Sequence, residues 1–430
     1  MKFKIVSLGC KVNSYECEAL INDLTLKGWE LTKKDECDVV IINTCTVTQT
    51  SDSKSRQMIR SLKRKNPNAI VVAMGCYVQL NPEVAGSIAD IVIGTNGRAK
   101  IYDLVNSYIN TRKEINEVTN IMEVTDYEEL KVNAVMTHTR GFVKIQDGCE
   151  NYCSYCAIPY SRGKIRSRLP ENVIEEINRL VNSGTNEVII SGINTGTYGK
   201  DLGTINLAQL IEKIMEETKL YRLRLSSIEM MEVTDELLDV IEKYKDRFAN
   251  HLHIPLQGGS DSVLTRMNRK YLTDGYRKLI YNIRKRFKDV AITTDLLAGF
   301  VGETEEEFKD TCSFIKEMQF SDMHIFPYSR RKGTKADEMK GHLNPQVINE
   351  RAHILLDIKN EMKEKYEAKF IGQTFDVITE QVKGDYFTSH SSNYLEILIP
   401  KHGLKDNMIK KIKIVEINNG NIIGQGVENE

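Results

Sequence analysis

The chain has 430 residues, of which 41% are hydrophobic and 28% charged, with a formal net charge of −1. This composition is typical of a globular protein, and the length predicts two or three domains. No apolar run is long enough to cross a membrane, and residues 1–6 start directly in a strand pattern, which argues against a signal peptide. We therefore expect a cytoplasmic protein with no membrane partner.

Strand and helix patterns alternate through residues 1–110, which predicts an open parallel α/β sheet. The expected strands are 2–7, 38–43, 69–74 and 90–93, and the expected helices are 14–27, 51–65 and 99–110. Residues 111–138 are polar and acidic and have no clear period. We interpret them as a linker.

A second alternation begins at residue 141, in a central domain that we place at residues 139–368. Its expected strands are 141–146, 186–190, 221–226, 250–254, 289–295 and 322–326, and its expected helices are 171–182, 205–217, 234–245, 274–287 and 304–317. Six such units predict a partial or full barrel of parallel strands. A helical pattern over 344–368 follows as a connector.

The tail, residues 369–430, has short β-rich runs separated by Gly and Asn turns, at 374–380, 394–399 and 409–417. This pattern predicts a small all-β, OB-like module.

Basic residues cluster at 54–65, 162–168 and 264–288, and in the tail at Lys401, Lys405, Lys410, Lys411 and Lys413. On a nearly neutral chain such clusters indicate a phosphate-binding surface, with solvated faces or an inert capping domain as the alternative.

Three of the nine cysteines, Cys149, Cys153 and Cys156, fall in one short loop just after the strand at 141–146. Clustered cysteines in a reducing compartment indicate metal or redox chemistry. Three thiolates on a cubane cluster would leave one iron without a protein ligand, open to substrate. The alternative is a zinc site or buried structural cysteines, but no fourth Cys or His lies between Cys156 and Lys200.

A second trio, Cys10, Cys45 and Cys76, follows the first three expected strands. Open α/β sheets bind ligands at the carboxyl edge of their strands, so we expect these thiols to meet there. Separate buried core cysteines are the alternative. The other three cysteines lack this placement, and we interpret them as structural: Cys17, Cys37 and Cys312.

The pattern Cys149-x3-Cys153-x2-Cys156 resembles the signature of the radical S-adenosylmethionine (SAM) superfamily. Together with the N-terminal cysteines and the β-rich tail, it resembles the methylthiotransferases over nearly the whole chain. The resemblance implies an N-terminal cluster domain at 1–110, a central partial (β/α) radical SAM barrel with a connector helix at 139–368, and an RNA-binding TRAM domain at 369–430. It also implies two [4Fe–4S] clusters, one on each trio.

Residues 8–13, Leu-Gly-Cys-Lys-Val-Asn, resemble the branch that modifies N6-threonylcarbamoyladenosine next to the anticodon of tRNA. The implied reaction begins with reductive cleavage of SAM at the cluster on Cys149, Cys153 and Cys156, which gives a 5′-deoxyadenosyl radical. This radical removes hydrogen from C2 of the base, and the second cluster provides sulfur that another SAM has methylated. The implied partners are tRNA and a reductant such as flavodoxin or ferredoxin.

Seven residues near the ends of the expected barrel strands are predicted to contact SAM. They are Tyr155, Gly192, Asn194, Glu229, Gln257, Gly299 and Glu303. An ordinary packed aromatic ring, plain turns and surface positions explain the same residues as alternatives.

Two other functions remain open from the sequence. The first is the same radical chemistry on another target, either isopentenyladenosine in tRNA or a ribosomal protein. The second is a non-enzymatic RNA-binding protein with loops that zinc holds together.

Overall fold

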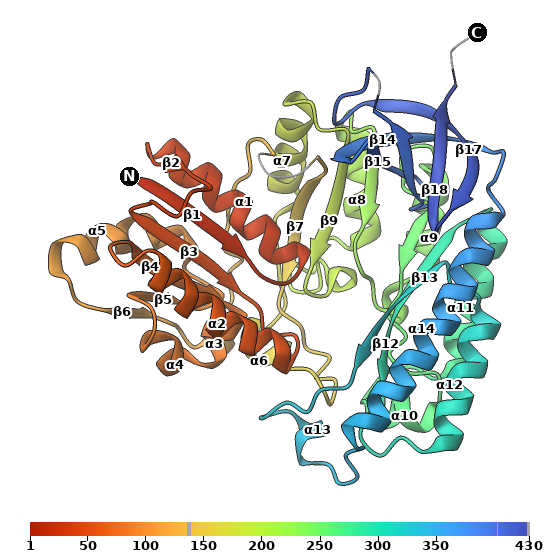
Figure 1. Ribbon diagram of the computed structural model, residues 1–430, viewed down its shortest axis with the longest axis horizontal. Helices are drawn as coiled ribbons and strands as arrows, with labels where there is room; N and C mark the ends of the chain where they lie inside the picture. The colour runs from red at the N-terminus through yellow and green to blue at the C-terminus, as the bar shows by residue number, and fades with distance from the viewer. Residues whose placement is uncertain (136–138, 402, 428–430) are drawn as a thin grey trace.

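The computed structural model describes residues 1–135, 139–401 and 403–427. Residues 136–138 of the expected linker, and 402 and 428–430 of the expected tail module, lie outside the described residues. Figure 1 shows an N-terminal sheet domain, a central partial barrel and a small C-terminal β-barrel, so the α/β architecture expected from the sequence is confirmed. None of the described helices is both long and apolar enough to span a membrane.

The N-terminal sheet has six parallel strands in the order β2-β1-β3-β4-β5-β6. The strands are β1 (Lys2–Ser7), β2 (Glu30–Leu31), β3 (Val39–Thr44), β4 (Ile70–Gly75), β5 (Ile91–Ile93) and β6 (Ile115–Glu117). The helices are α1 (Lys11–Leu26), α2 (Gln49–Lys65), α3 (Cys76–Leu80), α4 (Pro82–Gly86) and α5 (Ile101–Thr111). Every residue of β3 and β4 is buried, as expected for central parallel strands with both faces covered.

The expected linker is not wholly structureless. Its residues Ile115–Glu117 form β6, which pairs with β5 and completes the first sheet. This strand is three residues long and none of them is buried, so it has no hydrophobic period that the sequence could reveal.

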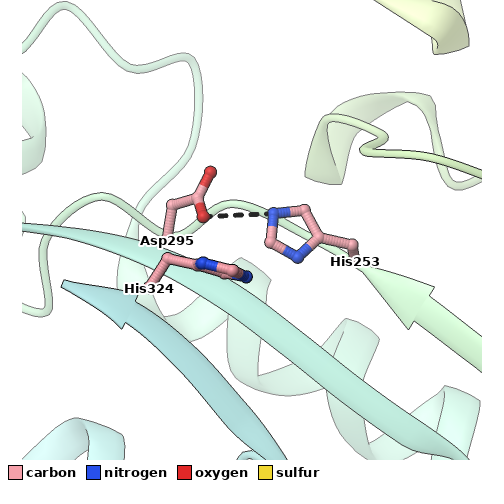
Figure 2. A group of neighbouring side chains, drawn as sticks. All are labelled: His253, Asp295 and His324. Carbon is pink, nitrogen blue, oxygen red and sulfur yellow. Dashed lines mark ion pairs between the residues drawn. The ribbon is translucent and has the colours of Figure 1, made fainter. Parts of the chain in front are cut away.

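The central domain contains six parallel strands and one short antiparallel strand, β8. They are β7 (Gly141–Asp147), β8 (Arg166–Ser167), β9 (Glu187–Gly192), β10 (Arg222–Leu225), β11 (His251–His253), β12 (Ala291–Ala298) and β13 (Asp322–Pro327). They form two sheets, β10-β9-β7-β8 and β11-β12-β13, joined by the isolated parallel bridges Leu223–Phe248 and Ser227–His253. In the described chain β13 does not pair with β7, so the barrel is partial. His253, Asp295 and His324 lie together on β11, β12 and β13 (Figure 2).

Helices follow the barrel strands and pack their apolar stripes on them. They are α6 (Ile158–Arg162), α7 (Pro170–Asn182), α8 (Leu207–Glu217), α9 (Asp235–Lys243), α10 (Asp261–Arg266), α11 (Thr273–Arg286), α12 (Glu305–Met318), α13 (Lys335–Glu338) and α14 (Pro345–Ala368). Capping boxes fix two of the starts, Asn206 with Gln209 before α8 and Thr304 with Glu307 before α12. The connector α14 covers β12 and β13.

The C-terminal module is a closed five-stranded barrel, which confirms the all-β, OB-like expectation. Its strands are β14 (Thr374–Lys383), β15 (Tyr386–Ser391), β16 (Glu396–Pro400), β17 (Ile409–Asn418) and β18 (Asn421–Gly426). It sits on the amino ends of the central strands, where Arg224 Nη2 donates to Ser391 O at 3.1 Å and Arg222 Nη2 donates to Asp376 O at 3.0 Å. The carboxyl ends of the central strands are left free of it.

Helix α1 docks the N-terminal domain on the central barrel. Tyr15 and Ala19 of α1 belong to the apolar core of the barrel, and the Tyr15 hydroxyl donates to Leu130 O at 2.7 Å. The next residue, Glu16, carries the polar part of the contact. Its Oε1 accepts from Arg162 Nη1 at 2.5 Å and from Lys144 Nζ at 3.0 Å.

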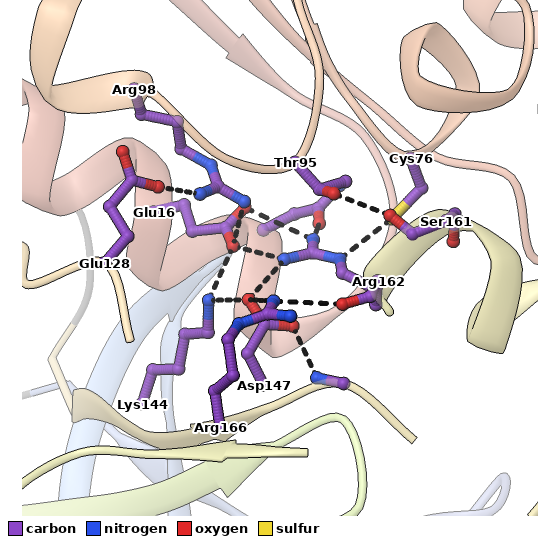
Figure 3. A network of polar contacts seen from close by, with 12 residues as sticks. Glu16, Cys76, Thr95, Arg98, Glu128, Lys144, Asp147, Ser161, Arg162 and Arg166 are labelled. Atoms are coloured by element: carbon purple, nitrogen blue, oxygen red, sulfur yellow. Dashed lines mark hydrogen bonds and ion pairs between the residues drawn. The ribbon is translucent and has the colours of Figure 1, made fainter. Parts of the chain in front are cut away.

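Glu16 and Arg162 are the centre of a buried network of charges that spans both domains (Figure 3). Arg162 and Glu16 are both 0% exposed. Burial alone would raise the pKa of Glu16, but the Arg162, Arg98 and Lys144 cations hold it well below its usual value. The carboxylate therefore stays ionised in the interior, and the contact between the domains is an ionic one.

The basic cluster at 162–168 is therefore neither a solvated face nor a phosphate-binding surface, and both interpretations are wrong for this stretch. Arg162, Arg166 and Arg168 are buried, and only Lys164 is exposed. Arg168 Nη2 pairs with the buried Glu176 at 3.0 Å. A run of arginines looks the same in sequence whether its partners are solvent or distant carboxylates.

Loss of the central cation should destabilise the fold. We expect Arg162→Gln to lower the free energy of unfolding by about 3–5 kcal/mol, because Glu16 and Asp147 would remain buried with less compensating charge. Arg330→Gln is the matched control, since Arg330 pairs with Asp337 at the surface and its loss should cost less than about 1 kcal/mol. Denaturant unfolding of the metal-free chain measures both, and equal losses would contradict the central role of Arg162.

Candidate functional site

The first cysteine trio lies on the loop that leaves β7 at the carboxyl end of the barrel. Gly148 starts this loop with a left-handed φ of +77°, and a Cβ there would lie 1.7 Å from the Lys164 carbonyl oxygen. Only glycine fits this position. The loop then folds back on itself through a hydrogen bond from Cys156 N to Cys153 O at 2.9 Å.

The thiols of Cys149, Cys153 and Cys156 are half-buried and act on one another electrostatically. Burial, together with the neighbouring Cys153, raises the pKa of Cys149 to about 11 and that of Cys156 to about 12. These neighbouring thiols resist ionisation on their own. A bound metal cation would replace their protons, so the group suits a metal centre.

Arg269 is a site residue that sequence reasoning missed. Its Nη1 donates to Cys153 Sγ at 3.2 Å, and its guanidinium also pairs with Glu229 and contacts the Tyr271 hydroxyl. The guanidinium thus provides a cation and a hydrogen bond at the sulfur of Cys153. The only signal in the sequence is its place in the basic stretch 264–288, which does not point to a cysteine more than a hundred residues away.

The second trio meets at the carboxyl edge of the N-terminal sheet, as the strand pattern predicts. Cys10 is the N-cap of α1, Cys45 directly follows β3, and Cys76 opens α3 after β4. Burial raises the pKa of Cys10 to about 11, and the Cys76 and Cys45 thiols act in the same direction. The three thiols are therefore near enough to act on one another electrostatically, and the positive end of α1 favours an anion beside Cys10.

Two glycines make this close approach possible. Gly9 has a φ of +109°, and a Cβ there would lie 2.8 Å from Cys45 Sγ. Gly75 has a φ of +101°, and a Cβ there would lie 2.3 Å from Asn43 Oδ1. Each of these glycines immediately precedes a cysteine of the trio, so the Gly-Cys pair turns the chain sharply at the end of the strand.

Arg162 connects the surroundings of the two trios. Its Nε donates to Cys76 Sγ at 3.1 Å, and its Nη1 lies 3.3 Å from Asp147 Oδ2 (Figure 3). Asp147 is the last residue of β7, two residues before Cys149. The buried charge network thus runs from the edge of one trio to the strand that carries the other.

Three of the predicted SAM-contact residues lie close to the first trio or to strand ends beside it. Tyr155 packs its ring against the edge of Phe300, with the centroids 6.3 Å apart, and Glu229 is held by Arg269. The side-chain amide of Asn194 is buried, and neither its Nδ2 nor its Oδ1 has a hydrogen-bond partner in the described part of the chain. An orphan amide beyond the carboxyl end of β9 is available to a ligand.

The other four predicted SAM-contact residues serve visible backbone or packing roles. A Cβ at Gly192 would lie 2.9 Å from Gln146 Oε1, and Gln257 adopts a left-handed φ of 68° beside β12. The Glu303 carboxylate accepts from Gly299 N at 3.1 Å and from Arg351 Nη1 at 2.8 Å, contacts that fasten α14. These contacts leave their SAM roles as predictions.

Two protein-family models match the chain. The radical SAM superfamily matches residues 143–315, and a family described as uncharacterized protein family UPF0004 matches residues 2–94. Among solved structures, the radical SAM methyltransferase TsrM from Kitasatospora setae superposes with a TM-score of 0.55 at 14% identity, over 76% of this chain and 73% of that one. At this identity the likeness shows the fold alone.

Curated relatives match over almost the whole length. Threonylcarbamoyladenosine tRNA methylthiotransferase MtaB of Bacillus subtilis (strain 168) is 40% identical over 95% of this chain and 92% of its own. The protein of the same name from Chlamydia pneumoniae is 33% identical over 98% and 97%. The tRNA-2-methylthio-N(6)-dimethylallyladenosine synthase of Caldicellulosiruptor saccharolyticus is 34% identical over 88% and 82%. The chain therefore belongs to the radical SAM methylthiotransferase family and is of the MtaB type.

Proposed function

We propose that the protein is a tRNA methylthiotransferase that adds a methylthio group to C2 of N6-threonylcarbamoyladenosine next to the anticodon. The observation that carries the proposal is the pair of cysteine trios, one at the carboxyl end of each parallel sheet, with Arg162 linking their surroundings. A C2–H bond is neither acidic nor open to simple nucleophilic attack, so radical chemistry suits this substrate. A tRNA substrate also implies work in the cytoplasm.

We assign a [4Fe–4S] cluster to Cys149, Cys153 and Cys156 and a second one to Cys10, Cys45 and Cys76. The donor sets fit, because each offers three thiols that share one space and so leaves one iron without a cysteine. When bound, the first cluster supplies the electron that cleaves SAM to a 5′-deoxyadenosyl radical, and the second supplies the sulfur.

The residues of the chain bind, orient and shield the reactants. Arg269 at Cys153 and Arg162 at Cys76 offset the negative charge of the thiolates through hydrogen bonds to sulfur. The orphan amide of Asn194 offers a donor and an acceptor to the polar groups of SAM. Glu229, held by Arg269, and Tyr155 line the same loop, and the burial of this region keeps water from a reactive radical.

Exposed lysines on the terminal barrel favour tRNA as the partner. Lys411 and Lys413 of β17 face solvent and alternate with the buried Ile412 and Ile414. Lys401 and Lys405 are also exposed, and Lys410 is half-buried. A row of outward cations on an OB-like barrel suits an RNA backbone. We further propose that the electron for SAM cleavage comes from a small reductant such as flavodoxin or ferredoxin.

The two trios should have separable effects on the reaction. Cys153→Ala should abolish both 5′-deoxyadenosine and the methylthio nucleoside, because SAM cleavage depends on the first trio. Cys45→Ala should abolish the methylthio nucleoside but leave 5′-deoxyadenosine formation. Mass spectrometry of digested tRNA and of the small products measures both. Cys312→Ala, a half-buried cysteine on α12, is the control and should retain wild-type activity.

Metal analysis after anaerobic purification separates this proposal from the non-enzymatic alternative. Iron and sulfide should be present and should fall in each of the two trio variants. Zinc without iron would instead favour an RNA-binding protein with zinc-held loops, and an unchanged tRNA nucleoside profile would exclude the proposed substrate.

The terminal lysines should set part of the salt dependence of tRNA binding. We expect Lys411→Gln with Lys413→Gln to reduce the slope of log affinity against log salt by about 1 per lysine, because each contact with a phosphate releases counterions. Lys365→Gln is the control, since Lys365 lies on α14 and pairs with Glu361 at 2.6 Å. Filter binding over a range of salt concentrations measures the slopes, and identical slopes for wild type and the double variant would contradict a phosphate-binding role.

A further inference from the structure

Lys11 stands at the start of α1, the helix of the N-terminal domain that packs against β7 and β9 of the central barrel. It is the first residue of α1 and directly follows Cys10. Its electrostatic neighbours are Arg140 before β7, Arg224 on β10 and Asp295 on β12. The side chain is exposed, and within the described ranges no hydrogen bond or ion pair engages its ammonium group. The amino group of Lys11 is therefore free to donate hydrogen bonds.

The neighbouring arginines are already paired. Arg224 Nε donates to Glu187 Oε1 at 2.8 Å, and Arg140 Nε lies 3.0 Å from Glu380 Oε1. They act on Lys11 by repulsion and so make this part of the interior receptive to an anion. Each Arg224 nitrogen already has an acceptor, and Arg140 has only Nη1 without a hydrogen-bond partner. Lys11 is therefore the cation of the three that is least engaged by protein groups.

The polar group His253, Asp295 and His324 lies on β11, β12 and β13 (Figure 2), and Asp295 is one of the charged groups that act on Lys11. His253 Nε2 is 3.2 Å from Asp295 Oδ1, and its Nδ1 is 2.8 Å from Thr293 Oγ1. One donor atom from each of the three residues lies within 4.8 Å of the others, a set that could hold a metal ion. Lys11, which has no carboxylate partner within the described ranges, opposes a metal ion there because it would repel a second cation.

The substrates of the two tRNA-modifying groups of relatives differ in a way that this interior can distinguish. The threonylcarbamoyl substituent carries a carboxylate, a hydroxyl and a urea group, whereas the dimethylallyl substituent is a hydrocarbon. A free ammonium near imidazoles can form hydrogen bonds with the threonylcarbamoyl group. Beside the dimethylallyl group the same ammonium would lose its bound water and gain no hydrogen bond in return. The site is thus chemically matched to an anionic, polar substituent.

We propose that Lys11 binds the carboxylate of the threonylcarbamoyl group in the barrel interior and so selects the substrate. The His253, Asp295 and His324 group lies beside the hydroxyl and urea atoms, and Asp295 Oδ1 is held 3.2 Å from His253 Nε2. The inference rests on the proposed function and extends it. Because Lys11 follows Cys10, a carboxylate held there keeps the adenine beside the second trio.

The test compares two anticodon stem–loop RNAs on the same reconstituted enzyme. One carries N6-threonylcarbamoyladenosine, and the other carries the same nucleoside with its carboxylate converted to a primary amide. Wild type should favour the carboxylate RNA by about 10- to 100-fold in kcat/KM and in binding, the range for one hydrogen bond to a charged group. Lys11→Gln should reduce this ratio to near one, and Lys11→Arg should restore most of it.

Comparing two RNAs on one protein cancels any partial loss of cluster that a substitution beside Cys10 causes. Lys27→Gln is the matched control, because Lys27 caps the other end of α1 and pairs with Asp23 at 2.9 Å, and it should keep the wild-type ratio. A Lys11→Gln enzyme with an undiminished ratio would overturn the inference. A wild-type enzyme that leaves both RNAs unmodified would instead overturn the proposed function.

Discussion

The contact between Glu16 and Arg162 is the constraint on which the rest of the molecule depends. A carboxylate and a guanidinium fully removed from water are stable only with complete and well-oriented partners. Glu16 meets this demand with cations from both domains, Arg98, Lys144 and Arg162. Because a small shift would leave charge uncompensated, this contact holds the two domains in the arrangement seen here. That arrangement brings Arg162 to Cys76 and fixes one trio relative to the other.

The candidate functional residues lie in loops at the ends of the strands rather than on the faces of the sheets. Both sheets are parallel, so their carboxyl ends gather loops, and Gly9, Gly75 and Gly148 turn those loops tightly enough to bring cysteines together. The amino ends of the central strands are covered by the terminal barrel. The proposed chemistry and the proposed RNA binding thus fall in different parts of the fold, with the barrel interior between them.

The sequence predicted much of the fold, because apolar periodicity is a local signal. The helix expected at 171–182 is α7 (Pro170–Asn182), and the cysteines of each trio lie together as their strand positions require. It missed β6, β15 and β18, which are short or carry polar and glycine residues that blur the period. It also could not assign Arg162 or Arg269, since their partners are distant in sequence and only tertiary packing reveals them.

In the proposed reaction, a radical derived from SAM takes hydrogen from C2 of the modified adenine. The most direct measurement uses tRNA with deuterium at C2 of that adenine and follows the label by mass spectrometry. One deuterium should appear in the 5′-deoxyadenosine that accompanies each methylthio product. Unlabelled 5′-deoxyadenosine, formed together with the methylthio nucleoside, would contradict the proposed reaction.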